Sequence, residues 1–235
     1  AGLGIGVAGP FATIAGVAAE WQLAIESSTA QASVAAGPRG RVELEAVLTG
    51  PRQSEILMDP LGKVLNQVPK GEGLRLVIVG TGPGSYNGAR VGIAAGQGVA
   101  LVHDCPAVGL CSLEALEPVR AGGPCLAVGD ARRGSFSAMV LREGRLSGEP
   151  ELLEEEAFVA RVQAALSAGE RIVTMEDPER LPEVVRQHCQ VEMPVARLLL
   201  HAWAARGEEE QQALLERPPQ PFYLRPPYVT KPAGS

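Results

Sequence analysis

The segment Leu74–Val102, LRLVIVGTGPGSYNGARVGIAAGQGVALV, decides the fold because it contains a strand, a glycine loop and a helix in succession. Its apolar, β-branched beginning, Leu76–Val79, is too short for a helix and predicts a buried strand. The next residues, Gly80–Gly84, predict a loop that depends on the backbone freedom of glycine. Ser85 is a candidate N-cap, and Gly88–Val102 is predicted to form the helix.

This arrangement can hold a phosphate on free backbone N–H groups at the start of the helix. The loop nevertheless lacks the Lys-Ser/Thr pair that follows the last glycine of a P-loop. It also departs from the dinucleotide-binding pattern, because the glycine after Gly84 comes four residues later, at Gly88, instead of three. The loop by itself is therefore weak evidence for phosphate binding.

The glycines inside the predicted helix are its most unusual feature. Each glycine in a helix interior costs about 0.8–1 kcal/mol relative to alanine, so Gly88, Gly92 and Gly96, spaced four apart, predict a close approach by another part of the backbone. The approaching backbone belongs either to a crossing helix of a partner or to the same domain. The spacing leaves both alternatives open.

Composition limits the function. The chain has 235 residues, 46% hydrophobic but only 4% aromatic, which is enough for a large core of the α/β type. Its net charge of −6 argues against nucleic-acid binding by electrostatics alone. The four cysteines form no CxxC and the three histidines no HxxxH, so we predict no metal site, and reduced cysteines in a cytoplasmic protein.

Residues 1–21 are predicted to be an extension of unknown role. The stretch has no charged side chain before Glu20, yet it has no basic start, and glycine and proline interrupt it. It is a poor signal peptide and a poor membrane span, and we expect no membrane attachment.

The remaining chain repeats one pattern. Leu23–Glu26 and Leu126–Asp130 are both apolar strands that end in an acid, and each precedes a polar turn, two further strands and a helix. Other elements are expected as strands over 32–36, 41–48, 107–109, 135–141 and 171–175, and as helices over 54–68, after Ser112, over 154–168 and over 194–206. A proline-rich tail without regular structure is expected over 218–227.

The repeat predicts an α/β fold of two tandem lobes, over 22–120 and 121–235, the first more complete. It resembles the actin and sugar-kinase (ASKHA) plan, in which the acid that ends the first strand of each lobe faces the metal and phosphates of a nucleotide.

Five sequence blocks are similar to the TsaB (YeaZ) family, in that family's order, over about residues 22–228. They are Leu23-Ala24-Ile25-Glu26-Ser27-Ser28, Gly82-Pro83-Gly84-Ser85-Tyr86-Asn87-Gly88-Ala89-Arg90, Cys111-Ser112-Leu113-Glu114-Ala115-Leu116, Asp130-Ala131-Arg132-Arg133-Gly134 and Tyr223-Leu224-Arg225. The resemblance implies a non-catalytic subunit that supports TsaD in threonylcarbamoyl transfer to the adenosine beside the anticodon of tRNAs reading ANN codons. It implies no catalytic residue, cofactor or metal of its own.

The resemblance also implies partners. TsaD would dock on helices of the first lobe, a TsaE-like ATPase would join the pair, tRNA would bind only through the complex, and the chain alone would form a homodimer. The candidate interface residues lie on the two predicted helices of the first lobe: Leu57, Leu61, Leu65, Gly88, Val91, Gly92, Ala95, Gly96 and Val99.

The alternative function is a free-standing ATPase or kinase of the same fold. Glu26 and Asp130 would be its acids and Gly82–Ser85 its phosphate loop, but no lysine lies beside the loop and no adenosine-binding Gly-Gly motif is evident. The simpler interpretation makes both acids caps of the turns that follow them. The candidates for a vestigial nucleotide site are Glu26, Gly82, Gly84, Ser85, Asp130, Arg132 and Arg133.

Overall fold

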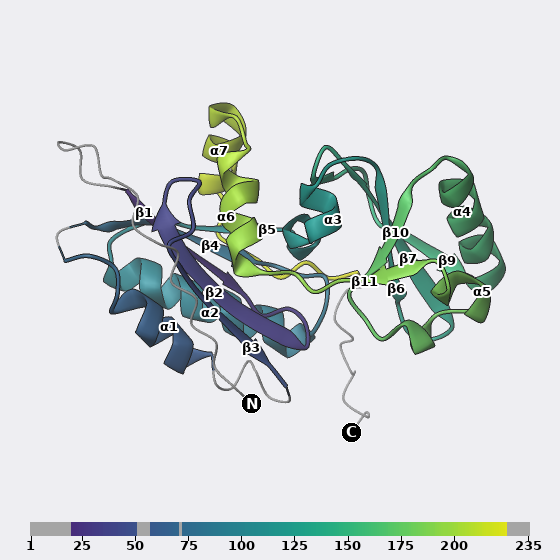
Figure 1. The fold of residues 1–235 in the computed structure, drawn as a ribbon, viewed down its shortest axis with the longest axis horizontal. Helices are drawn as coiled ribbons and strands as arrows, with labels where there is room; N and C mark the ends of the chain where they lie inside the picture. The colour runs from purple at the N-terminus through teal and green to yellow at the C-terminus, as the bar shows by residue number, and fades with distance from the viewer. Residues whose placement is uncertain (1–19, 51–56, 71, 225–235) are drawn as a thin grey trace, which may run out of the picture.

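The computed structural model describes residues 20–50, 57–70 and 72–224. Two mixed sheets lie side by side along the long axis of the molecule (Figure 1). The first sheet has the order β3-β2-β1-β4-β5. Its strands are β1 (Trp21–Glu26), β2 (Gln31–Pro38), β3 (Leu44–Thr49), β4 (Leu74–Gly80) and β5 (Ala107–Leu110).

Successive side chains of β1 point to opposite faces of the first sheet, and each face has its own hydrophobic core. Leu23 and Ile25 point to one face, where α1 (Met58–Leu65) and α2 (Tyr86–Val102) cover them. Ala24 points to the opposite face, which α6 (Ala196–Ala204) covers. Figure 1 shows the two layers, with α1 and α2 on one side of the strands and α6 on the other.

The second sheet repeats the plan of the first. Its order is β11-β10-β6-β7-β8, and β9 also pairs with β7. The strands are β6 (Cys125–Asp130), β7 (Ser135–Arg142), β8 (Arg145–Leu146), β9 (Glu151–Glu154), β10 (Arg171–Thr174) and β11 (Cys189–Val191). In both sheets the acid-ending strand pairs antiparallel with the next strand and parallel with a later one. The predicted two-lobed α/β fold is therefore confirmed.

The helices of the second sheet differ in length from those of the first. They are α4 (Glu155–Ser167), α5 (Glu183–Arg186) and the 3-10 turn η2 (Pro178–Arg180). Phe158 and Val162 of α4 pack into the core beside β6 and β7. The helix α5, which corresponds to α2, has only four residues, so the first lobe is the more complete, as predicted.

The connection between the sheets differs from the prediction. Instead of one helix after Ser112, there is a 3-10 turn, η1 (Ser112–Ala115), and a separate short helix, α3 (Glu117–Arg120). Leu116 has an extended backbone, and Pro118 is tolerated because it lies in the first turn of α3, where no helical N–H is needed.

The predicted assignment of all residues 121–235 to the second lobe is wrong for α6. Leu199 and Trp203 belong to the same core as Ile78 of β4, and the Ala196 N–H donates to Ser33 Oγ of β2 at 2.8 Å. The chain thus returns to the first sheet after β11, and α7 (Glu208–Leu215) follows α6 there. Residues 1–19 of the predicted extension and residues 54–56 lie outside the described residues, whereas Trp21, predicted as the end of the extension, is the buried first residue of β1. No helix in the described part of the chain is long and apolar enough to cross a membrane.

Candidate functional site

A cleft of about 910 Å³ lies between the two lobes. It brings together most of the nucleotide-site candidates from the sequence. The C-terminal ends of β1 and β6 and the N-terminal end of α2 all lie beside it. The candidates that line it are Gly84, Ser85, Asp130, Arg132 and Arg133. Leu113, Met139, Met175 and Phe222 add an apolar part to its wall.

Three backbone donors of the glycine loop and the start of α2 are used within the chain. The Thr81 N–H donates to Leu110 O at 2.9 Å, and the Gly82 N–H donates to Ser112 Oγ at 2.9 Å. At the start of α2, Ser85 is the predicted N-cap, and its Oγ accepts from the Gly88 N–H at 3.2 Å. These three donors are therefore not free to hold a phosphate.

Close packing explains why the loop needs glycine. Gly84 has a φ of +147°, and a Cβ there would overlap the carbonyl oxygen of Ser28. The Ser85 N–H donates to the same Ser28 oxygen. The loop thus packs directly on the turn that follows β1.

Glu26 is fully buried behind this loop and is not part of the cleft wall. Burial raises the pKa of its carboxyl group, although hydrogen bonds from Ser112 and Ser28 oppose the shift. Its Oε1 accepts from the Ser28 N–H at 2.7 Å, so the acid caps the turn after β1. The absence of a side chain at Gly80 makes the space that its Oε2 occupies.

Asp130 occupies the equivalent position in the second lobe but faces the cleft. Its Oδ1 accepts from the Arg132 N–H at 2.7 Å, and its Oδ2 forms an ion pair with the Arg132 guanidinium at 3.0 Å. Glu176 lies beside it, where burial raises the pKa of the Glu176 carboxyl group. Arg132 and Arg133 both have left-handed backbones, with φ of +67° and +58°. Asp130 therefore caps a tight turn at the rim of the cleft.

The proline-rich tail contributes to the site in a way that sequence reasoning missed. The Phe222 N–H donates to Thr81 O of the glycine loop at 2.8 Å, while the Phe222 and Leu224 side chains pack on the core of the second sheet. The Tyr223 ring stacks on Tyr86 at the start of α2, with 5.1 Å between ring centroids. Aromatic residues within a proline-rich stretch were the signal that could have indicated this anchoring.

Titration of Glu26 provides a prediction about pH. Because its pKa is raised in the folded state, the native protein holds this proton at pH values where the unfolded chain has lost it. Its contribution to stability therefore falls as pH rises from about 4.3, the ordinary value for glutamate, through the raised pKa. We expect Glu26→Gln to have a higher Tm than wild type at pH 7 and no such advantage at pH 4. The exposed variant Glu216→Gln should follow wild type at both pH values, and a constant difference between Glu26→Gln and wild type would contradict the prediction.

The predicted partner interface needs correction. Leu57, Leu61 and Val99 are buried in the core of the first lobe. A Cβ at Gly88 or Gly92 would overlap Ser27, and one at Gly96 would overlap the Val79 side chain. The glycine face of α2 is thus occupied by the protein's own sheet. The prediction that these six residues form part of a partner interface is wrong, because they pack within the first lobe.

The opposite face of α2 is exposed. We call it the outer α2 face; Val91 and Ala95 are the interface candidates on or beside it, and Leu65 of α1 is half-buried. Its exposed apolar and small residues are Val91, Ala94, Gly98, Leu101 and Val102.

Fold and cleft define a two-lobed α/β protein of the actin and sugar-kinase-like class. A family model described as "TsaD: tRNA N6-adenosine threonylcarbamoyltransferase" matches residues 49–174, more than half of the chain. The chain belongs to this family, which also includes YeaZ.

Solved structures support the fold. YeaZ from Pseudomonas aeruginosa has a TM-score of 0.62 and 23% identity, covering 87% of this chain and 100% of that one. A second structure from P. aeruginosa, described as an uncharacterized protein with similarity to peptidase YEAZ, has a TM-score of 0.62 and 26% identity, covering 88% and 100%. The uncharacterized protein ML0378 of Mycobacterium leprae is 41% identical over 76 residues, 32% of this chain. The match spans about a fifth of that relative's length.

Proposed function

We propose that the chain is a non-catalytic subunit that supports a TsaD-like catalytic subunit in threonylcarbamoyl transfer to the adenosine beside the anticodon of ANN-decoding tRNAs. Family membership supports this pathway, and the exposed apolar outer α2 face is the observation that supports the role of a partner subunit. A TsaE-like ATPase joins the pair, and in the absence of partners a second copy of the chain occupies the same face.

The outer α2 face has the properties of a docking surface. Leu101 and Val102 are 84% and 81% exposed. Single exposed apolar residues are ordinary on a protein surface, but Leu101 and Val102 are consecutive and lie on the same helix as the exposed Val91, which supports an interaction site on α2. Ala94 and Gly98 lie on the same face, where their small size lets a partner approach the helix backbone.

Hydrogen bonds within the chain, at the glycine loop and at both strand-end acids, support the proposal that the subunit is non-catalytic. An ATPase or kinase of this fold would need loop donors and acids directed at a nucleotide, whereas the Gly82 N–H and both strand-end acids have partners within the chain. Steady-state phosphate release from ATP by the purified chain would favour the ATPase alternative.

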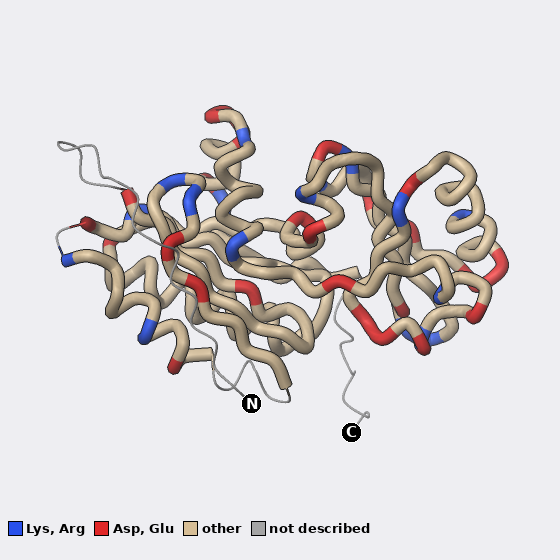
Figure 2. Tube along the Cα trace, viewed as in Figure 1, with Lys and Arg blue, Asp and Glu red and all other residues tan. Residues whose placement is uncertain are grey.

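Charge supports an indirect role in binding tRNA. Figure 2 shows acidic and basic residues interspersed along the described chain, without a continuous basic tract, and the net charge is −6. Tight binding to nucleic acid depends on clustered phosphate contacts. We therefore propose that tRNA binds through the assembled complex.

Substitution of Leu101 tests the docking surface. Leu101→Lys places a cation near the C-terminus of α2, where the helix dipole favours it, so the variant should fold with an unchanged Tm. We expect it to run as a monomer in sizing experiments and to capture the TsaD homologue of the same source at least about tenfold less tightly, the effect of losing about 1.4 kcal/mol of contact.

The matched control is Leu152→Lys on β9 of the second lobe, where leucine is also exposed, at 41%. This variant should dimerise and capture the TsaD homologue like wild type. Full capture by Leu101→Lys would contradict the proposed docking surface, and equal loss in both variants would show that the effect is not specific to α2.

A further inference from the structure

The turn η1, which joins the two lobes, is held by contacts with both of them. All four residues of η1 are buried. Leu113 packs in the core of the second sheet, Ala115 packs in the core shared by the first sheet and α6, and Ser112 Oγ accepts from the Gly82 N–H. A hinge that allows lobes to open and close must absorb changes in backbone angles. Here the connecting turn is held on both sides.

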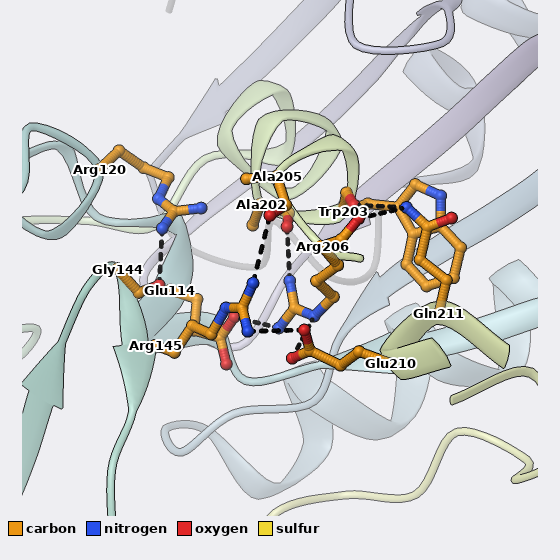
Figure 3. Close-up of polar contacts among 10 residues, drawn as sticks. All are labelled: Glu114, Arg120, Gly144, Arg145, Ala202, Trp203, Ala205, Arg206, Glu210 and Gln211. Atoms are coloured by element: carbon orange, nitrogen blue, oxygen red, sulfur yellow. Dashed lines mark hydrogen bonds and ion pairs between the residues drawn. The ribbon is translucent and has the colours of Figure 1, made fainter. Parts of the chain in front are cut away.

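The third residue of this turn, Glu114, forms an ion pair with Arg206, two residues after the end of α6 (Figure 3). Their side chains are 8% and 4% exposed. Arg206 Nη1 also donates to Ala202 O at 2.6 Å, which fixes the guanidinium at the end of α6. Breaking this pair would leave a charge buried without its partner, which is strongly unfavourable.

A second ion pair connects β8, the edge strand of the second sheet that lies beside η1, to the same place. Arg145, at the start of β8, contacts Glu210 of α7 at 2.6 Å and donates to Ala205 O at 3.2 Å. Glu210 also lies 3.5 Å from Arg206 Nε. Arg120 of α3 donates to Gly144 O at 2.7 Å, so the β7–β8 turn is held from the linker as well. Figure 3 shows Glu114, Arg145, Arg206 and Glu210 converging below the end of α6, with Arg120 and Gly144 to one side.

We propose that Glu114, Arg145, Arg206 and Glu210 form an ionic lock that holds the two lobes in one relative orientation. Glu114 belongs to the linker, Arg145 to the second lobe, and Arg206 and Glu210 to the helices α6 and α7 that follow the return to the first lobe. A rotation of one lobe against the other separates Arg145 from Glu210 and pulls Glu114 from Arg206. The cleft therefore keeps a fixed opening, and the protein acts as a rigid body. This inference does not depend on the proposed function.

The lock can be tested by measuring the distance between the lobes. Lys63 on α1 and Gln163 on α4 are exposed and lie in different lobes, and p-acetylphenylalanine at both sites carries spin labels without involving the native cysteines. We expect one narrow distance distribution in the wild-type chain. In Arg145→Met/Glu114→Gln we expect the distribution to become wider by about twofold, because the lobes then populate more than one orientation.

Arg161→Met is the matched control, since it removes an ion pair with Glu151 that lies within the second lobe and is comparably exposed. Its distribution should stay narrow. A double variant that is folded by circular dichroism and as narrow as wild type would overturn the lock, as would equal broadening in the control. If Glu114→Gln prevents folding, Arg145→Met alone keeps the test valid, because its side chain is 39% exposed and its loss leaves the buried pair intact.

Discussion

Arg206→Met is expected to lower the free energy of unfolding by about 3–5 kcal/mol, the cost of leaving one member of a buried ion pair without its partner. The Glu114 carboxylate would stay enclosed between η1 and α6, where water cannot solvate it. The contact of Arg206 with Ala202 O would be lost at the same time. Urea unfolding at pH 7, followed by circular dichroism, measures the change as a shift in the midpoint.

Two further variants separate the charge effect from the loss of packing. Arg206→Met/Glu114→Met removes both charges and should recover most of the loss, because apolar replacements of a complete buried pair are often neutral. Arg161→Met removes a partly exposed pair and should cost no more than about 1 kcal/mol. A loss in Arg206→Met no larger than in Arg161→Met would show that the buried pair contributes little to stability.

Local patterns predicted the strands of the first lobe because its apolar runs are short, β-branched and bounded by glycine and polar turns. Leu76–Val79 is buried in β4 as expected, although the strand extends from Leu74 to Gly80, and Ser85 caps α2 through its hydroxyl group. The repeated strand-acid pattern was also sufficient to predict two lobes. These features depend on neighbours in the sequence, and so they can be derived from it.

Long-range placement could not be derived in the same way. An apolar helix such as Ala196–Ala204 can cover either sheet, and only the folded chain shows that it returns to the first. The ionic lock joins residues as distant in sequence as Glu114 and Arg206, each of which is an ordinary charged residue in its local context. The cleft candidates were brought together, but their hydrogen bonds depend on turns that the sequence does not specify.

The glycines of α2 show where pattern reasoning is ambiguous. Spacing by four residues places Gly88, Gly92 and Gly96 on one face and predicts a close neighbour, but it does not identify the neighbour. The most apolar and closely packed stripe of a helix ordinarily faces its own core. Leu101 and Val102 are exposed and lie at the C-terminal end of the helix. The four-residue spacing of the glycines does not indicate that these two residues are exposed.

Leucine substitutions at two glycines of the same helix are expected to have opposite effects. At Gly92 a side chain would overlap Ser27 Oγ and point at Ile25 of the sheet, so we expect Gly92→Leu to lose about 3 kcal/mol or more, the upper end of the range for overpacked cores. At Gly98 a Cβ meets no other atom within 4 Å. Gly98→Leu should therefore fold and gain up to about 0.8–1 kcal/mol, the difference in helix propensity.

The same pair distinguishes packing within the lobe from docking of a partner. Gly98→Leu fills the outer α2 face and should fail to dimerise or to capture the TsaD homologue, although its urea midpoint is higher than that of wild type. Gly92→Leu should be mostly unfolded at 37 °C in circular dichroism. A Gly92→Leu variant with the wild-type unfolding midpoint and no capture of the homologue would instead place the partner on the glycine face, against the position of Ser27 and Ile25 beside it.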